Sequence, residues 1–313
     1  MGFPIALPGS PLIKNLGKAG NMLSLEFFLE VLARGIGLGI AYALMGLGLA
    51  LVFGVMRITN FACGEFYMLG AFVIFYLITL FNIPAFLAII LGMIALFFIG
   101  VIIERLLLSP VAKDKVSNPM EYSMIITFAL SILLKNVAVA LFGSHYRNIP
   151  DYFTGFLHVG SVSIPYSIIF SSVVSIILIV AVMLFLNNTW TGRGLRALSQ
   201  SRNGAKVMGV NIPVYNAMVF GISASLAAVA GGVLAPLTLV YPTVGGAPLI
   251  KGYVILAIGG LGSIGGSLVA GILLGVVESV GSVLLSSAYK DFYGFGLLIL
   301  FLIFRPRGLF GQE

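Results

Sequence analysis

Two acidic residues lie in otherwise apolar parts of this sequence. Glu65 is at the start of one apolar segment, and Glu278 is inside another. Ionisable groups are costly in apolar surroundings at membrane depth, and such residues are by default candidates for function. The two carboxylates could line a polar pathway, or they could have structural partners in Lys135, Asn60 or backbone amides. Lys135 could pair with either acid, or extend its long side chain to an interface.

The other reactive side chains form no catalytic or metal-binding pattern. The chain has one cysteine, Cys63, so it cannot form an internal disulfide. His145 and His158 are thirteen residues apart in a polar loop, and we interpret them as surface residues. The glycine run 259–266 lacks the Lys-Ser/Thr ending of a phosphate-binding loop. We therefore expect no enzyme activity, metal or cofactor on this chain.

The composition indicates a membrane protein. Hydrophobic residues make up 60% of the 313 residues and charged residues 9%, whereas a soluble domain carries roughly 25% charge. A net charge of +7 would suggest nucleic acid in a soluble protein, but loop charges of a membrane protein explain it more simply. We predict one all-α membrane domain over residues 1–313, embedded in a lipid bilayer and without a nucleic-acid partner.

Apolar runs predict eight or nine transmembrane helices. The run 35–56 is 22 residues long without a charge, which is enough to cross about 30 Å of hydrocarbon. The run 248–258 is too short to span unaided, so we predict a broken or re-entrant helix there. We interpret residues 1–24 as a surface segment. The predicted helices cover 35–56, 66–81, 85–103, 122–142, 166–186, 214–236, 248–258, 267–285 and 292–304.

Glycines interrupt the apolar pattern after the short run, at Gly259, Gly260, Gly262, Gly265 and Gly266. At membrane depth a glycine-rich break must be buried in protein or line a wet cavity, because lipid cannot satisfy the backbone groups. The segments 57–73 and 259–276 share a pattern, since each places a glycine-containing break before a helix with small residues. This pattern predicts two related halves around a central pathway.

The loop 187–213 carries four cations and no acid between two charge-free runs. Ala197, Ser201, Ala205 and Gly209 recur every four residues, which predicts one small-residue face on a short helix. Such a face would let another protein approach closely. Alternatively, the loop only sets membrane orientation and has no partner. The cations are Arg193, Arg196, Arg202 and Lys206.

The distribution of cations predicts the orientation. Cytoplasmic loops are enriched in Lys and Arg, and placing the loop 187–213 inside gives a bias of ten to six. The inner residues are Arg57, Arg105, Lys113, Lys115, Arg193, Arg196, Arg202, Lys206, Arg305 and Arg307. The outer residues are Lys14, Lys18, Arg34, Arg147, Lys251 and Lys290. We therefore expect an external N-terminus and a cytoplasmic C-terminus.

Four ordered motifs carry a family resemblance. They are RITNFACGEFYMLG at 57–70, GRGLRA at 192–197 with MGVN at 208–211, GGLGSIGG at 259–266 and FRPRGLF at 304–310. In this order the motifs resemble the permeases of branched-chain amino acid ABC transporters, specifically the LivH-like subunit. The sequence departs from the family pattern at Cys63, where a histidine is usual, and at Asn203, where an acid is usual.

The resemblance implies a subunit of a binding-protein-dependent importer in a prokaryotic inner membrane. The implied partners are a LivM-like permease, two ATPase subunits that hold ATP and Mg²⁺, and an extracytoplasmic binding protein. The loop 187–213 would then dock into an ATPase groove. Similar permeases import urea, amides or other amino acids, and the residues do not discriminate among these cargoes. A stand-alone secondary transporter is the alternative mechanism.

Overall fold

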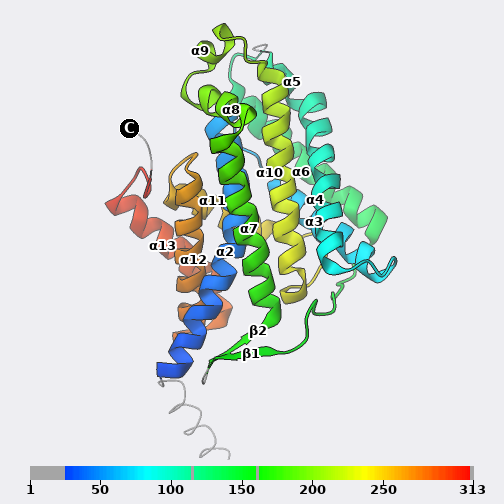
Figure 1. Ribbon diagram of the computed structural model, residues 1–313, viewed down its shortest axis with the longest axis vertical. Coiled ribbons are helices and arrows are strands. Elements are labelled where there is room, and N and C mark those ends of the chain that lie inside the picture. Colours follow the sequence, from blue (N-terminus) through cyan, green and yellow to red (C-terminus); the bar gives the residue numbers. More distant parts are fainter. Residues whose placement is uncertain (1–24, 114–115, 160–161, 311–313) are drawn as a thin grey trace, which may run out of the picture.

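The computed structural model describes residues 25–113, 116–159 and 162–310. Its helices run mainly along one axis, with α8 and α9 at one end and a small β-hairpin at the other (Figure 1). We call these the α8–α9 end and the hairpin end. The predicted surface segment 1–24 lies outside the described residues. The elements are α2 (Leu25–Met56), α3 (Cys63–Thr79), α4 (Ala85–Ile103), η1 (Glu104–Leu108), α5 (Ser109–Ala112), α6 (Pro119–Phe142), β1 (Phe156–Val159), β2 (Val162–Pro165), α7 (Tyr166–Asn188), α8 (Trp190–Gln200), α9 (Arg202–Val207), α10 (Ile212–Leu234), η2 (Ala235–Leu237), α11 (Gly246–Gly259), α12 (Ile264–Leu284), η3 (Ser287–Tyr289) and α13 (Lys290–Phe304).

The helices confirm the predicted polytopic, all-α architecture. Seven helical stretches of the described chain are long and apolar enough to cross a membrane, and α3 and α11 are shorter apolar helices of 17 and 14 residues. The predicted span 85–103 matches α4 at both ends. One difference lies in the polar loop 143–165, where β1 and β2 pair antiparallel from Phe156 opposite Pro165 to Val159 opposite Val162.

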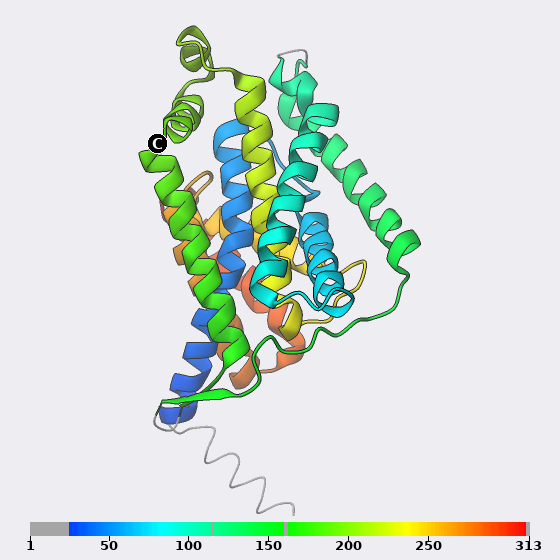
Figure 2. The same cartoon turned by 45° about the vertical axis from the view of Figure 1, so that its right-hand side comes forward.

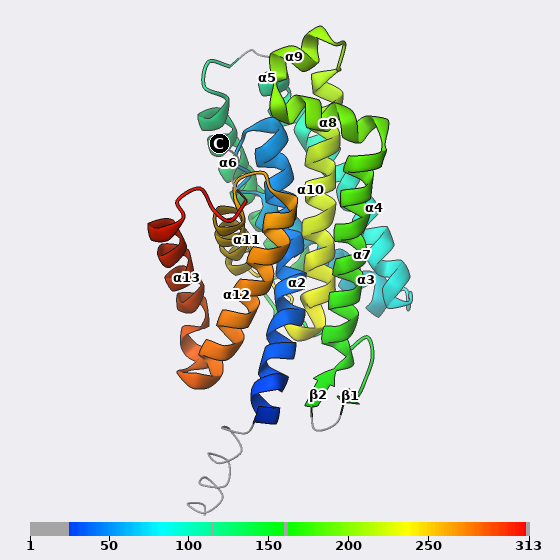
Figure 3. The ribbon, with the colours of Figure 1, turned by 60° about the vertical axis from the view of Figure 1, so that its left-hand side comes forward.

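The core is built around α2 and α10, whose central parts are almost entirely buried. α12 packs along α2, and α13 lies outside α12 (Figure 3). Glycines bring the backbones together: a Cβ on Gly39 would lie 2.8 Å from the Cα of Ile272 in α12. Close approach through small residues is the usual way in which membrane helices pack. In contrast, α6 diverges from the core and is largely exposed (Figure 2).

Two halves of the chain repeat one arrangement with opposite direction. α2 runs from the hairpin end to the α8–α9 end, and α10 runs back (Figure 1). α2 packs against α11 and α12, while α10 packs against α3 and α4. α6 contacts α3, as α13 contacts α11. The prediction of related halves agrees with this arrangement, but its pairing was wrong: the counterpart of the break 57–62 and α3 is the segment 235–259, not 259–276.

The starts of α3 and α11 meet inside the bundle. A Cβ on Gly64 would lie 2.6 Å from the carbonyl oxygen of Gly245, and a Cβ on Gly245 would overlap the carbonyl group of Gly64. Because α2 and α10 end at opposite ends of the bundle, both connecting segments must turn back into the interior to reach this contact. The break before α3 is stabilised in part by α6, since Phe61 N donates to Thr127 Oγ1 at 3.1 Å.

The sequence predicts a break at membrane depth in the glycine run 259–266. The structure shows a turn between two helices instead. Its turn lies at the α8–α9 end, where a Cβ on Gly262 would be 2.9 Å from the Cα of Gly54 near the end of α2. Gly260 and Gly262 have positive φ angles of 99° and 85°, which glycine adopts without steric cost. Gly259, Gly265 and Gly266 belong to α11 and α12. The run is therefore a tight turn between two helices.

The third predicted helix ends at residue 103, before Glu104 and Arg105, and this end was wrong. α4 continues through the π-helical turn η1 into α5, and Glu104 is 1% exposed. The carboxylate oxygen Oε1 of Glu104 has no hydrogen-bond partner among the described residues. The apolar residues after Arg105 continue the helix beyond the point where the charges suggested that it stopped.

We predict that Gly245→Ala destabilises the fold and that the neighbouring Gly246→Ala does not. The added methyl group at position 245 would overlap the Gly64 carbonyl group, whereas a Cβ on Gly246 meets no atom within 4 Å. Overpacking typically costs about 1–3 kcal/mol. Thermal unfolding of the purified protein in detergent should show a lower Tm for Gly245→Ala alone. Equal Tm values for the two variants would contradict the close contact between α3 and α11.

Candidate functional site

Glu65 lies in the first turn of α3 and is 7% exposed. Its Oε1 accepts a hydrogen bond from Ser131 Oγ of α6 at 3.0 Å, while Oε2 is buried without a partner among the described residues. The sequence had offered Lys135, Asn60 or backbone amides as partners. The structure gives Ser131 instead, and Lys135 lies one turn further along α6 with an exposed side chain. Glu65 thus joins the first turn of α3 to the outlying helix α6.

Asn60 lies in the break before α3, close to aromatic side chains. It is 1% exposed, and its Oδ1 accepts from Ala62 N at 3.1 Å. The adjacent Phe61 ring is 5.5 Å from the ring of Tyr253 in α11 and 6.3 Å from that of Phe128 in α6. Within the described chain, Asn60 Nδ2 and the Tyr253 hydroxyl are buried without hydrogen-bond partners. The break therefore presents unused polar groups between α6 and α11.

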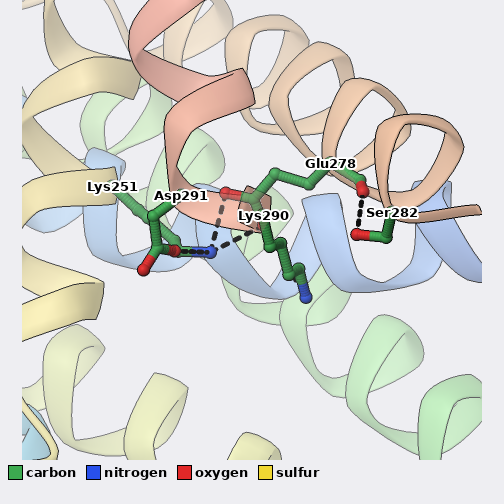
Figure 4. Close-up of polar contacts among 5 residues, drawn as sticks. All are labelled: Lys251, Glu278, Ser282, Lys290 and Asp291. Carbon is green, nitrogen blue, oxygen red and sulfur yellow. Dashed lines mark hydrogen bonds and ion pairs between the residues drawn. The ribbon is translucent and has the colours of Figure 1, made fainter. Parts of the chain in front are cut away.

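Glu278 of α12 is buried in an ion-pair cluster (Figure 4). The Nζ of Lys251 in α11 donates to its two carboxylate oxygens at 2.7 and 2.6 Å, and Lys290 Nζ is 3.7 Å away. Lys251 also contacts Asp291 of α13 at 3.1 Å and lies over the Tyr42 ring. The partner of Glu278 is therefore Lys251, not Lys135, Asn60 or a backbone amide.

The sequence places Lys251 among the outer cations, although it lies within the predicted short helix 248–258. Lys251 lies in the second turn of α11, and its side chain is only 12% exposed. Its place in a helix was therefore predicted, but its ion pair with Glu278 was not. A buried, paired lysine does not act as a loop charge, and its inclusion in the count of outer cations was wrong.

The loop 187–213 forms two helices, so the predicted single small-residue face is wrong. The chain is extended at Ser201, whose hydroxyl caps α9 by accepting from Gly204 N at 3.1 Å. Ala205 is 3% exposed because it packs against Leu198 and Ile212, and Ala197 packs against the same cluster. Ala205 therefore holds α9 onto the bundle and is not free to contact a partner, while Ala197 is half-buried against the same cluster.

The cations of this loop differ in their contacts. Arg202 Nη2 donates to the carbonyl oxygens of Val111 and Ala112 at 2.8 and 3.2 Å, which joins α9 to α5. Arg196 Nη1 donates to Asn187 Oδ1 at 3.1 Å. The Arg193 guanidinium lies 4.7 Å from the centre of the Trp190 ring. Lys206 has an exposed side chain.

The outer tip of the loop is apolar, which sequence reasoning missed. Val207 and Met208, directly after Lys206, are 87% and 83% exposed. Gly209 follows with a φ of 82°, and a Cβ added there would meet no atom within 4 Å. We call Val207 and Met208 the apolar tip. The signal in the sequence was this apolar pair at the end of a basic segment, outside any predicted span.

Comparison with known proteins identifies the family of this chain. The family model for the permease component of the branched-chain amino acid transport system matches residues 31–302. The chain belongs to this family of permease components. The match covers both inverted halves, from within α2 to within α13.

Several relatives resemble the permease over nearly its full length. The permease protein BraD of the high-affinity branched-chain amino acid transport system of Pseudomonas aeruginosa is 32% identical over 305 residues, covering 93% of this chain and 98% of that protein. The corresponding LivH of Salmonella typhimurium is 33% identical over 301 residues, with 91% and 96% coverage. A probable LivH of Methanocaldococcus jannaschii is 30% identical over 289 residues, with 86% and 88% coverage.

We predict that the buried ion pair of the permease stabilises the fold only while both charges are present. Glu278→Gln would leave the Lys251 ammonium without its best acceptor and cost about 3 kcal/mol of unfolding free energy. Replacing both charges, by Lys251→Met with Glu278→Leu, should recover most of this loss because no charge remains buried and unpaired. Lys290→Gln is the matched control, since its ammonium is 3.7 Å from Glu278 and more exposed.

Denaturant titration of the purified variants would measure these differences. A double variant as unstable as Glu278→Gln would contradict this interpretation.

Proposed function

We propose that this chain is one permease subunit of an ABC importer for branched-chain amino acids. The family match over residues 31–302 carries the proposal, together with relatives whose names specify branched-chain amino acid transport. In this proposal a second, LivM-like permease completes the pathway, and an extracytoplasmic binding protein delivers the substrate. Two ATPase subunits hold ATP and Mg²⁺. The importer lies in the inner membrane of a prokaryotic cell.

The orientation follows from the charges at the two ends. Arg57 Nη2 donates to Ser199 O at the end of α8, and Phe310 N, just beyond Arg305 and Arg307, donates to Gly259 O at the turn after α11. The basic residues of α8 and α9 lie at this same end. We infer that the α8–α9 end is cytoplasmic, which places the start of α2 outside and the C-terminal segment inside.

We place ATPase coupling at the α8–α9 end. The apolar tip is exposed beyond the transmembrane helices, where an isolated monomer gains nothing from displaying large apolar side chains. Contact with a groove of another protein would bury them, and Arg193 and Lys206 would add exposed charges at the rim, worth about 0–1 kcal/mol each as ion pairs. Fit at the apolar tip should therefore matter more than any single cation.

The proposed function is tested by reconstitution. Proteoliposomes that contain this permease, its partner permease and both ATPases should import leucine, isoleucine or valine only when the binding protein and ATP are present. ATP-independent uptake by this chain alone would favour a secondary transporter. Import of urea or amides in place of these amino acids would show that the proposed substrate is wrong, but would agree with the proposed ABC importer.

We predict opposite labelling of two exposed asparagines. A membrane-impermeant maleimide should label Asn148→Cys in intact cells, and Asn203→Cys only after permeabilisation. Both residues are exposed. Asn148 follows Arg147, which pairs with Val240 beyond the end of α10, whereas Asn203 lies in α9, before the start of α10. The native Cys63 is 0% exposed and should give little background. Labelling of both positions from the same side would reject the orientation.

We predict that Val207→Asp with Met208→Asp separates the ATPases from the permease. Both side chains are exposed, so membrane abundance should stay near normal, while ATPase co-purification falls about tenfold or more, as expected for buried interface anchors. Asn203→Asp is the matched control, because it adds a charge to exposed α9 without removing an apolar side chain. Unchanged co-purification and ATP hydrolysis in the double variant would remove the apolar tip from the proposed interface.

A further inference from the structure

A cavity of about 200 Å³ lies between α11, α12 and α13, beside the ion-pair cluster. Its charged lining consists of one cation, Lys251, and two anions, Glu278 and Asp291. Its apolar lining includes Ile250 and Phe295. Side chains at the mouth are exposed, Asp291 to 65% and Phe295 to 41%. A small molecule could therefore enter beside Asp291 and reach the Lys251 ammonium group.

The two carboxylates that contact Lys251 differ in burial and in the number and length of their contacts. Glu278 is 1% exposed and binds Nζ through both oxygens at 2.6 and 2.7 Å. Asp291 contacts Nζ through one oxygen at 3.1 Å and is mostly exposed. Figure 4 shows Lys251 Nζ between the two acids, with Asp291 on the opposite side from Glu278. The Lys251–Glu278 pair is thus fixed, whereas the Lys251–Asp291 contact can exchange at low cost.

The depth of Asp291 indicates what the mouth of the cavity faces. Asp291 lies inside the membrane-crossing stretch Ser287–Phe304. It is 14 residues before Arg305, or about 21 Å along the helix at 1.5 Å per residue, which is less than a hydrocarbon core of about 30 Å. With Arg305 at the cytoplasmic surface, Asp291 near the other end of α13 lies within the membrane. An exposed carboxylate facing lipid chains at that depth would be costly. The mouth is therefore expected to face water or another subunit.

We propose that this cavity binds a free zwitterionic α-amino acid with an aliphatic side chain. The amino-acid carboxylate takes the place of Asp291 on the Lys251 ammonium, and the freed Asp291 carboxylate pairs with the amino-acid ammonium. The aliphatic side chain lies against Ile250 and Phe295. The inference rests on the proposed function and adds to it a binding position within the permease.

Size and charge both select for such a ligand. A volume of about 200 Å³ corresponds to roughly seven water molecules at about 30 Å³ each, which is comparable to one aliphatic amino acid. An amine without a carboxylate could not replace Asp291 on the Lys251 ammonium. It would have to share the Asp291 carboxylate with Lys251. A carboxylate without an amine would displace Asp291 and leave it unpaired. Only a molecule with both groups keeps every charge paired.

The test is binding of tritiated leucine to the assembled importer in lipid nanodiscs, without binding protein. Asp291→Asn should raise the Kd at least about tenfold, because it removes the partner of the amino group. Ala247→Leu should raise the Kd as well, by filling the cavity from an exposed lining position. Glu121→Gln is the matched acid-to-amide control and should stay within about twofold of the wild type, since Glu121 is an exposed residue in the first turn of α6 and does not line the cavity. Valine should compete with leucine far better than isobutylamine or isobutyrate.

The possible outcomes distinguish a failure of the proposed binding site from a failure of the proposed function. An unchanged Kd in Asp291→Asn, with or without a lower Tm, would reduce the cluster to a structural contact and overturn the proposal. Wild-type importer that transports leucine in proteoliposomes but binds none in nanodiscs would also overturn the site, and would leave the proposed function standing. Failure of the wild type to transport any branched-chain amino acid would reject the function on which the site rests.

Discussion

The fold depends on one constraint: backbone broken inside a bilayer must be covered by protein, because lipid offers no hydrogen bonds. In the described chain, the segments before α3 and before α11 bring non-helical backbone into the interior of the bundle. The starts of the two short helices cover one another through Gly64 and Gly245, whose backbones touch. α2 and α10 close over them, and Thr127 of α6 accepts the amide proton of Phe61. The density of glycine and alanine in these helices follows from the same need, since only small residues allow such approach.

The two inverted halves treat charge differently. In the first half, the acid Glu65 of α3 bonds to Ser131 of α6. In the second, the base Lys251 of α11 contacts the acid Asp291 of α13 and is held by Glu278. In both halves a polar contact links the short central helix to the outlying helix of its own half. A movement of α6 or α13 would therefore act directly on α3 or α11, where the halves meet.

The sequence predicted the elements better than their meeting points. The start of the span 85–103 was placed correctly because Pro84 precedes a continuous apolar run, but its end was placed too early, since the helical stretch continues past Glu104 to Ala112. The break before α3 was predicted within the segment 57–73, but its counterpart was not. The contact that holds this break was not predicted either, because it runs from Phe61 N to Thr127 Oγ1, between residues far apart in the sequence. Conversely, the glycine run 259–266 suggested a break inside the membrane, but Gly260 and Gly262 serve a tight turn near the end of α2. The number of glycines in a segment therefore does not predict how deep in the membrane that segment lies.

The candidate sites show the same limit. Glu65 and Glu278 could be selected from the sequence because charges are rare in apolar segments. Their partners Ser131 and Lys251 could not, since both contacts join helices that are far apart along the chain. The small residues Ala197 and Ala205 had the spacing of an exposed face, but periodicity does not say which side of a helix is covered. The neighbouring Leu198 and Ile212 turned that face inward.

The central claim, that α11 begins inside the bundle and ends at the α8–α9 end, can be measured with pairs of spin labels. One label replaces Asn203 on α9, and the second replaces either Gly246 at the start of α11 or Leu261 in the turn after it. The 14 residues of α11 separate these two positions by about 20 Å at 1.5 Å per residue. Electron–electron double resonance should therefore give a clearly shorter distance from residue 203 to residue 261 than to residue 246. Equal distances, or a shorter distance to residue 246, would contradict the account.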